Sequence, residues 1–217
     1  MRHFLLFLLT CPPLLSLTQT VEILNEDFEG PSTVWSTTGN STSNQWIINS
    51  CAGNGPSAAG STSVYISKGG PDAGCGITGD IQYRSEDAPA GSEFTIVFTT
   101  VDAACLENLQ FTVDYKLIGE GYNGSSGPFH DFGQMVYSTD GGTTWQNATN
   151  EFYNVPSWST VTLPLPAALN GQTFEFGIMW TVDNSLINDP PLALDNIIIT
   201  GEDNTPPSVT CQGDINV

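Results

Sequence analysis

The sequence contains very few basic residues. Of its 217 residues, 4 are Lys or Arg and 23 are Asp or Glu. One basic residue, Arg2, lies at the N-terminus, and the rest of the chain has 3 basic against 23 acidic residues, a formal charge of −20. Nucleic-acid binding is excluded, because it needs clustered Lys and Arg to neutralise phosphates. Two explanations of the acidity stay open: solubility from surface carboxylates, and calcium binding, which needs clustered oxygen ligands.

Long apolar runs are scarce as well. The N-terminal stretch MRHFLLFLLTCPPLLSLTQT combines a basic start, a short apolar run and small polar residues, which is typical of a secretory signal peptide. No other segment approaches the roughly 18 apolar residues that cross a bilayer. We therefore predict a signal peptide over residues 1–20, no membrane span in this chain, and a secreted or cell-surface, extracellular location.

The cysteines lack the spacing of a zinc site. There is no C-x-x-C pair and no Cys/His pattern, whereas export permits disulfides. Cys51 and Cys75 both lie in segments rich in Gly and Ser, where a disulfide would offset weak local order. They are the first candidate pair, and the connectivity that also involves Cys105 stays open.

Helical periodicity is nearly absent from the sequence. Apolar residues alternate with polar ones or form short β-branched and aromatic runs between turn residues, and both patterns are typical of strands. About ten strands without a repeat favour an all-β sandwich over a propeller, whose blades repeat every ~40 to 45 residues. The predicted strands are 22–28, 45–48, 63–67, 94–100, 109–117, 133–138, 144–148, 159–165, 173–182 and 192–200.

The octet from Ser138 to Trp145, STDGGTTW, resembles the Asp-box of sialidases. A sialidase needs three arginines to clamp its substrate carboxylate, and one arginine, Arg84, follows the signal peptide. The octet instead predicts a tight hairpin, because Gly141 and Gly142 allow positive φ and Asp140 can accept backbone N–H groups. Trp145 is then expected to pack on the sheet.

Residues for catalysis are few. His130 is the single histidine after the signal peptide, and no G-x-S-x-G motif accompanies it. A carboxylate pair of the glycosidase type is not excluded by counting, since acids are abundant. Most of the acids lie singly in loops, so we predict that the chain is not an enzyme and assign no catalytic residue.

The two ends of the predicted domain both carry acids. The first strand ends in EDFEG and the last strand reads LALDNIII. If these strands lie side by side, a carboxylate from each can share one cation with oxygen ligands.

Several motifs in order resemble one family: DFEG, Trp46, SVYIS, LQFTVDYKLIGEG, YSTDGGTTW, FEFGIMW and LDNIIITG. Together they resemble the choice-of-anchor J, or cleaved-adhesin, jelly-roll domain of bacterial secreted proteins, which is similar in layout to the MAM adhesion domain. The resemblance covers roughly residues 22–201 and implies a jelly-roll β-sandwich over 21–201. It also implies structural calcium (Ca2+) held by Glu29 and Asp195, with Asp27 as an additional ligand. The alternative is that Glu29 caps a strand and Asp195 accepts backbone hydrogen bonds.

The tail over 202–217 changes in character. An acidic stretch with two prolines reads as a linker, because proline disfavours helix and central strand. The residues after it resemble the first strand of a hyalin-repeat (HYR) module, an immunoglobulin-like domain. We therefore predict a linker and the truncated start of a second domain.

One loop is the candidate ligand-binding surface. The stretch EGYNGSSGPFHDF presents Tyr122, Phe129 and His130 among glycines, which suits stacking on sugar rings; the alternative is that the aromatic rings fold inward. The family resemblance implies adhesion to glycans or to host or matrix surface proteins. We therefore expect a non-catalytic adhesion or ligand-binding module, with carbohydrate as a candidate ligand. The alternative is an accessory domain of an exported hydrolase, a glycosidase or protease, whose catalytic part is absent from this chain.

Overall fold

The computed structural model describes residues 18–30, 34–42, 44–52, 55–56, 60–67, 93–120, 130–183 and 190–203. Residues 1–17 of the predicted signal peptide (1–20) and residues 204–217 of the predicted linker and second domain (202–217) lie outside this part, whereas residues 19–20 and 202–203 lie in strands. The described residues form strands and one 3-10 turn, η1 (Ala167–Leu169). The strands are β1 (Gln19–Glu26), β2 (Ser36–Gly39), β3 (Gln45–Asn49), β4 (Ser63–Ser67), β5 (Glu93–Asp102), β6 (Leu106–Leu117), β7 (Phe132–Ser138), β8 (Gln146–Asn147), β9 (Val155–Pro164), β10 (Thr173–Val182) and β11 (Ala193–Asp203).

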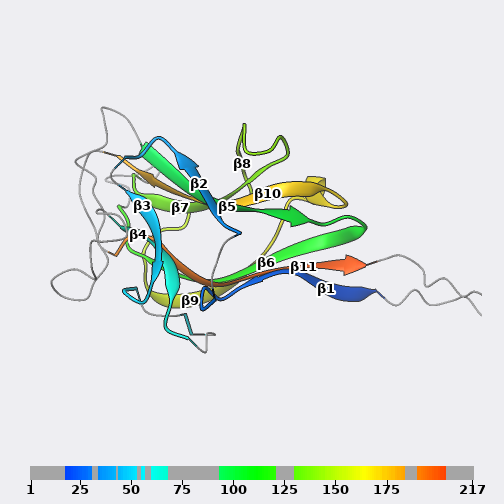
Figure 1. Cartoon of the computed structure of the whole chain (residues 1–217), viewed down its shortest axis with the longest axis horizontal. Coiled ribbons are helices and arrows are strands. Elements are labelled where there is room, and N and C mark those ends of the chain that lie inside the picture. Colours follow the sequence, from blue (N-terminus) through cyan, green and yellow to red (C-terminus); the bar gives the residue numbers. More distant parts are fainter. Residues whose placement is uncertain are drawn as a thin grey trace, which may run out of the picture.

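Two antiparallel sheets form a sandwich, which confirms the predicted fold class. The six-stranded sheet has the order β3-β4-β11-β6-β9, with β1 also paired to β11, and the five-stranded sheet has the order β2-β5-β10-β7-β8. Figure 1 shows the two sheets as layers, one above the other. The chain passes from one sheet to the other at every connection except β3–β4 and β7–β8. Each sheet therefore combines strands that lie far apart in the sequence.

The core lies between the sheets and follows the period of two expected of strands. In β10, the alternate residues Phe174, Phe176, Ile178 and Trp180 are buried, while Thr173 is exposed. Across the sandwich, the ring of Phe176 lies 4.9 Å from that of Phe111 on β6. Removing such side chains from water stabilises the fold by about 25 cal/mol per Å² of apolar surface.

The first and last strands are neighbours, as the sequence predicts. β1 pairs with β11 in antiparallel fashion, with Gln19 opposite Asp203 and Glu26 opposite Ile197. The pairing of β11 with β6 is irregular between Asp195 and Ile198, where Asn196 has a φ of 48°. This bulge changes the face on which the following side chains lie.

The predicted hairpin is confirmed. Asp140 accepts hydrogen bonds from the backbone N–H and the hydroxyl of Thr144, at 2.9 and 2.7 Å. These bonds, together with the one from Ser138, lower the pKa of Asp140 to about 2. Gly141 and Gly142 have φ values of 71° and 82°.

One strand was missed, and apart from β4 and β10 the predicted strands differ from the observed bounds by one to four residues at an end. β2 was missed, because its four residues STTG are all exposed and carry no apolar alternation. β8 spans residues 146–147 instead of 144–148, because Thr144 belongs to the turn that Asp140 closes. Trp145 packs on the sheet as predicted, with its ring 5.2 Å from that of Phe98.

Candidate functional site

Three acidic residues meet where strands end, at the end of the sandwich opposite the paired termini. Glu120 follows β6, Asp131 precedes β7 and Asp183 follows β10. Asp203 pairs with Leu106 at the start of β6, so the far end of β6 points away from the termini. We call Glu120, Asp131 and Asp183 the loop-end cluster.

The backbone fixes the loop-end cluster. Glu120 and Asp131 form an isolated β-bridge, in which the N–H of Glu120 donates to the carbonyl of Asp131 at 3.1 Å. Gly119 has a φ of 63°, and a Cβ at this position would collide with the same carbonyl oxygen. Glycine is therefore required for the close approach of the two segments.

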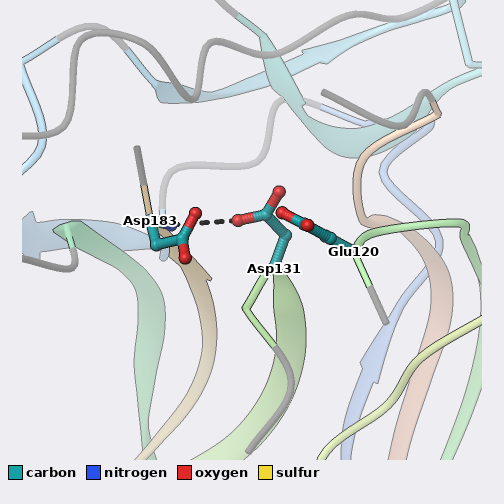
Figure 2. Close-up of side chains that lie close together, drawn as sticks. All are labelled: Glu120, Asp131 and Asp183. Atoms are coloured by element: carbon teal, nitrogen blue, oxygen red, sulfur yellow. Dashed lines mark hydrogen bonds between the residues drawn. The ribbon is translucent and has the colours of Figure 1, made fainter. Parts of the chain in front are cut away.

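The three carboxylates lie close together. Each offers an oxygen, and these oxygens all lie within 4.8 Å of one another. Glu120 is 4% exposed and Asp131 is 0% exposed. Figure 2 shows Asp131 between the other two, with the carboxylate of Glu120 turned toward it and Asp183 donating its backbone N–H to Asp131 at 3.0 Å. Such hard oxygen donors suit a calcium ion, and their charges repel one another without a cation.

His130 contacts the loop-end cluster. Its Nδ1 lies 2.5 Å from Oδ2 of Asp183, and the two side chains are 39% and 21% exposed. Of the predicted binding-loop residues, His130 is thus held at the base of the loop, while Tyr122 and Phe129 lie outside the described residues. The sequence contains a signal for this cluster that our predictions did not use: Glu120 and Asp131 flank the Gly-rich stretch that we predicted to bind ligand.

A second group of acids lies on the outer face of the six-stranded sheet. Asp114 on β6 is directly opposite Asp195 on β11, and both are 0% exposed. Glu29, which follows β1, accepts backbone N–H groups of Ser61 and Thr62 at 2.7 and 2.5 Å. We call Glu29, Asp114 and Asp195 the outer-face site.

The connection between β3 and β4 covers the outer-face site. The N–H of Gly55 donates to Oδ2 of Asp195 at 2.7 Å, and a Cβ at Gly55 would collide with Asp114. Lys116 also binds this connection, through a 2.7 Å hydrogen bond from its Nζ to the carbonyl of Ala52. The predicted ligands Glu29 and Asp195 are therefore brought to one connection.

Hydrogen bonds already occupy the outer-face carboxylates. Oδ1 of Asp195 accepts the N–H of Asn196 at 2.8 Å, and Asp114 accepts the side-chain amide of Asn196 at 2.8 Å and the hydroxyl of Thr160. Burial raises the pKa of Asp195, and repulsion by Asp114 and Glu29 raises it further, while the bonds from Gly55 and Asn196 oppose the shift. Sequence reasoning missed Asp114, because a single Asp on the outward side of a strand normally faces water.

The remaining predicted residues do not join these groups. Asp27 accepts the N–H of Glu29 at 3.1 Å in a local turn and is exposed. Cys75 lies outside the described residues, so its pairing with Cys51 stays a prediction. Cys105 is a free, exposed thiol in the β5–β6 turn.

The two sheets and the acidic loop end define a β-sandwich domain with a candidate cation site. No protein-family model matches the chain, and no curated protein sequence is similar to it. Solved structures are similar at low identity. One contains the CBM22-1 and GH10 modules of the Clostridium thermocellum endo-1,4-β-D-xylanase 10B complexed with xylohexaose, at 14% identity and a TM-score of 0.48. The match covers 87% of this chain and 30% of that chain.

Two others match over most of both chains. The CBM22-1 xylan-binding domain of Paenibacillus barcinonensis Xyn10C has 12% identity and a TM-score of 0.47, over 85% of this chain and 97% of that one. The K3 cleaved adhesin domain of Lys-gingipain from Porphyromonas gingivalis has 19% identity and a TM-score of 0.45, over 83% and 99%. The fold assignment rests on the strand pairing itself. Among the described residues, no helix has the length and hydropathy of a membrane span.

Proposed function

We propose that this chain is a non-catalytic, extracellular binding module of the adhesion type, whose loop end is organised by a structural calcium ion. The observation that carries the proposal is the convergence of Glu120, Asp131 and Asp183, whose carboxylate oxygens lie within 4.8 Å of one another. A divalent cation there would remove the repulsion between three acids, two of which are buried.

Calcium suits this donor set better than other metals. It accepts six to eight oxygen ligands in flexible geometry, whereas magnesium needs a near-ideal octahedron and keeps several waters. The ion would join the end of β6, the start of β7 and the end of β10, and so fix both ends of the segment 121–129. Tyr122, Phe129 and His130 would then present a ligand-binding surface to a glycan or a matrix protein.

The outer-face site is a second candidate for the ion. Its support is the raised pKa of Asp195, to which Asp114 and Glu29 contribute by repulsion. A cation shared by Glu29 and Asp195 would tie the two ends of the domain together, as the family resemblance implies. Asp27 would have to leave its local turn to take part.

The alternative of an accessory domain in an exported hydrolase shares the same binding role. The two proposals differ in the neighbouring domains: a hydrolase would carry a catalytic domain, and an adhesin would carry further adhesion domains. Within the described residues, Nδ1 of His130 contacts the carboxylate of Asp183.

Calorimetric titration of the chelator-treated full chain with CaCl2 and MgCl2 tests the proposal. We expect saturable calcium binding, weaker magnesium binding, and loss of the calcium signal in Asp183→Asn. A glycan array run in calcium and in EDTA tests the binding role. A chain that binds neither calcium nor any array component would contradict the proposed function.

A further inference from the structure

A pocket opens at one edge of the sandwich, and none of its lining residues belongs to the loop-end cluster or to the outer-face site. It has a volume of about 530 Å³ and lies between residues 147–152 and the facing strand β9. Small-molecule sites in proteins have volumes of about 300 to 1,000 Å³. The pocket is therefore large enough for a small ligand or for one unit of a longer one.

The rim over 147–152 is held rigidly by β7. The N–H of Ala148 donates to the carbonyl of Met135 at 2.8 Å, and Phe152 exchanges two backbone bonds with Gly133, of 2.7 and 3.2 Å. The side-chain amide of Gln134 adds a bond to the carbonyl of Thr149 at 2.9 Å. Because the rim is already ordered, ligand binding would not carry the entropic cost of ordering it.

The pocket has an apolar floor and a polar rim. Phe152, Val161 and Leu163 line the floor, and each is half-buried. The ring of Phe152 is itself supported by Tyr115, at 5.2 Å between ring centroids. The exposed amides of Asn147 and Asn150 stand on the rim, and each can both donate and accept hydrogen bonds.

The charge of the lining restricts the ligand. Glu151 is the charged residue that lines the pocket, and the chain as a whole is strongly acidic. An anionic ligand would be repelled by both. A sugar ring without charge fits all three features, because its C–H face can lie on an aromatic ring while its hydroxyl groups bind amides and a carboxylate.

We propose that this edge pocket binds one neutral sugar unit of an oligosaccharide, with its ring face against Phe152 and its hydroxyl groups bound to Asn147, Asn150 and Glu151. The assignment rests on the proposed binding function, and it adds a subsite distinct from the 121–129 loop.

A peptide strand is the competing occupant of the same edge. Within the described residues β9 pairs with β6 alone, so its other edge is open to strand addition. However, Pro156 and Pro164 lie within β9, and proline cannot donate a backbone hydrogen bond to an added strand. These features favour the sugar.

Calorimetric titration of the full chain tests the pocket, with cellohexaose and mannohexaose as neutral probes and hexagalacturonate as the anionic probe. We expect at least one neutral probe to bind and hexagalacturonate not to bind at the same concentration. Phe152→Ala should weaken binding about tenfold or more, as for an aromatic group central to an interface. Asn150→Ala should weaken it a few-fold, and its exposed position makes this variant the safer one for folding. Asn25→Ala, at an exposed asparagine on β1, is the matched control and should bind as the parent chain does.

The variants separate this proposal from the proposed function. Neutral binding that survives Phe152→Ala and Asn150→Ala but is lost in Tyr122→Ala or Phe129→Ala would overturn the pocket and leave the binding module standing. Binding of neither neutral probe would overturn the pocket, while calcium titration would still report on the loop-end cluster. Protection of β9 backbone amides from hydrogen exchange by an added peptide, without any sugar binding, would assign the edge to strand addition instead.

Discussion

The loop-end cluster and the outer-face site each bring three acids together, and they differ in what satisfies them. At the outer face, Asp195 and Glu29 each accept two hydrogen bonds from backbone N–H groups. At the loop end, Asp131 accepts the N–H of Asp183 and Asp183 contacts Nδ1 of His130, while one oxygen from each of the three acids lies within 4.8 Å of the others. The two groups therefore use carboxylates differently. The outer-face site holds the connection between β3 and β4, and the loop-end cluster brings three acids within reach of one cation.

The largest effect is expected where a buried acid holds backbone groups. Asp195→Ala would leave the N–H groups of Gly55 and Asn196 without their acceptor, and each unsatisfied buried donor costs about 1 to 3 kcal/mol. We expect the free energy of unfolding to fall by about 2 to 3 kcal/mol in urea unfolding with EDTA, because relief of repulsion offsets part of the loss.

Asp27→Ala is the control for this substitution. Asp27 is exposed and accepts one local bond, so its removal should change the free energy of unfolding by less than about 0.5 kcal/mol. Equal losses in the two variants would show that Asp195 does not organise the connection.

Calcium is expected to act through the loop-end cluster. A ligand that binds only the folded state stabilises it by about 2.7 kcal/mol at a free concentration one hundred times the Kd. We expect the melting temperature of the parent chain to be higher in calcium than in EDTA. Asp183→Asn should abolish this difference, whereas Asp195→Ala should lower the melting temperature in both conditions and preserve the difference. The reverse result would move the ion to the outer-face site.

A smaller effect is expected for one hydroxyl at the outer face. Thr160→Val removes the donor to Asp114 and should cost about 1 to 2 kcal/mol in urea unfolding, since the acceptor is a buried carboxylate. Thr162 lies two residues away on β9, and its hydroxyl bonds that of Thr112 at 2.9 Å in an exposed pair. Thr162→Val is therefore the matched control. An equal loss of unfolding free energy in Thr162→Val and Thr160→Val would show that the bond to the buried Asp114 carries no special weight.

The smallest effect is expected at Asp140, a fully exposed acid that serves as a comparison for the buried acids of the loop-end cluster and the outer-face site. Its pKa is lowered from 3.8 to about 2 by bonds from Thr144 and Ser138. A lowered carboxyl pKa contributes stability above the unfolded value, and this contribution is lost as the pH falls through the folded value. In EDTA, the melting temperature should therefore fall less steeply between pH 5 and pH 2 for Asp140→Asn than for the parent chain. Parallel curves for the two proteins would argue against the hydrogen bonds in the turn.

Local patterns predicted the strands, because alternation is a property of neighbouring residues. β4 and β10 were predicted with their observed bounds from SVYIS and TFEFGIMWTV. β2 escaped, because the STTG strand has no apolar side to reveal it. The turn at Asp140 followed from the same kind of local chemistry.

The sites depended on contacts that no local pattern encodes. Asp114 is buried because a connection from elsewhere in the chain covers the outer face, and Asp183 meets Glu120 because β6 and β10 end at the same end of the sandwich. The acids at the domain's two ends could be predicted to lie near each other, since β1 pairs with β11. Which oxygens meet, and which backbone groups satisfy them, required the folded arrangement.

The pairing of β1 with β11 has a mechanical consequence. Because Gln19 lies opposite Asp203, the chain enters and leaves the sandwich at the same end (Figure 1). A pull on the two ends would open the hydrogen bonds of this strand pair one after another, instead of loading all of them at once. The fold would therefore yield at low force from the terminal end, while the loop end that we propose as the binding surface would be the last part to feel the load.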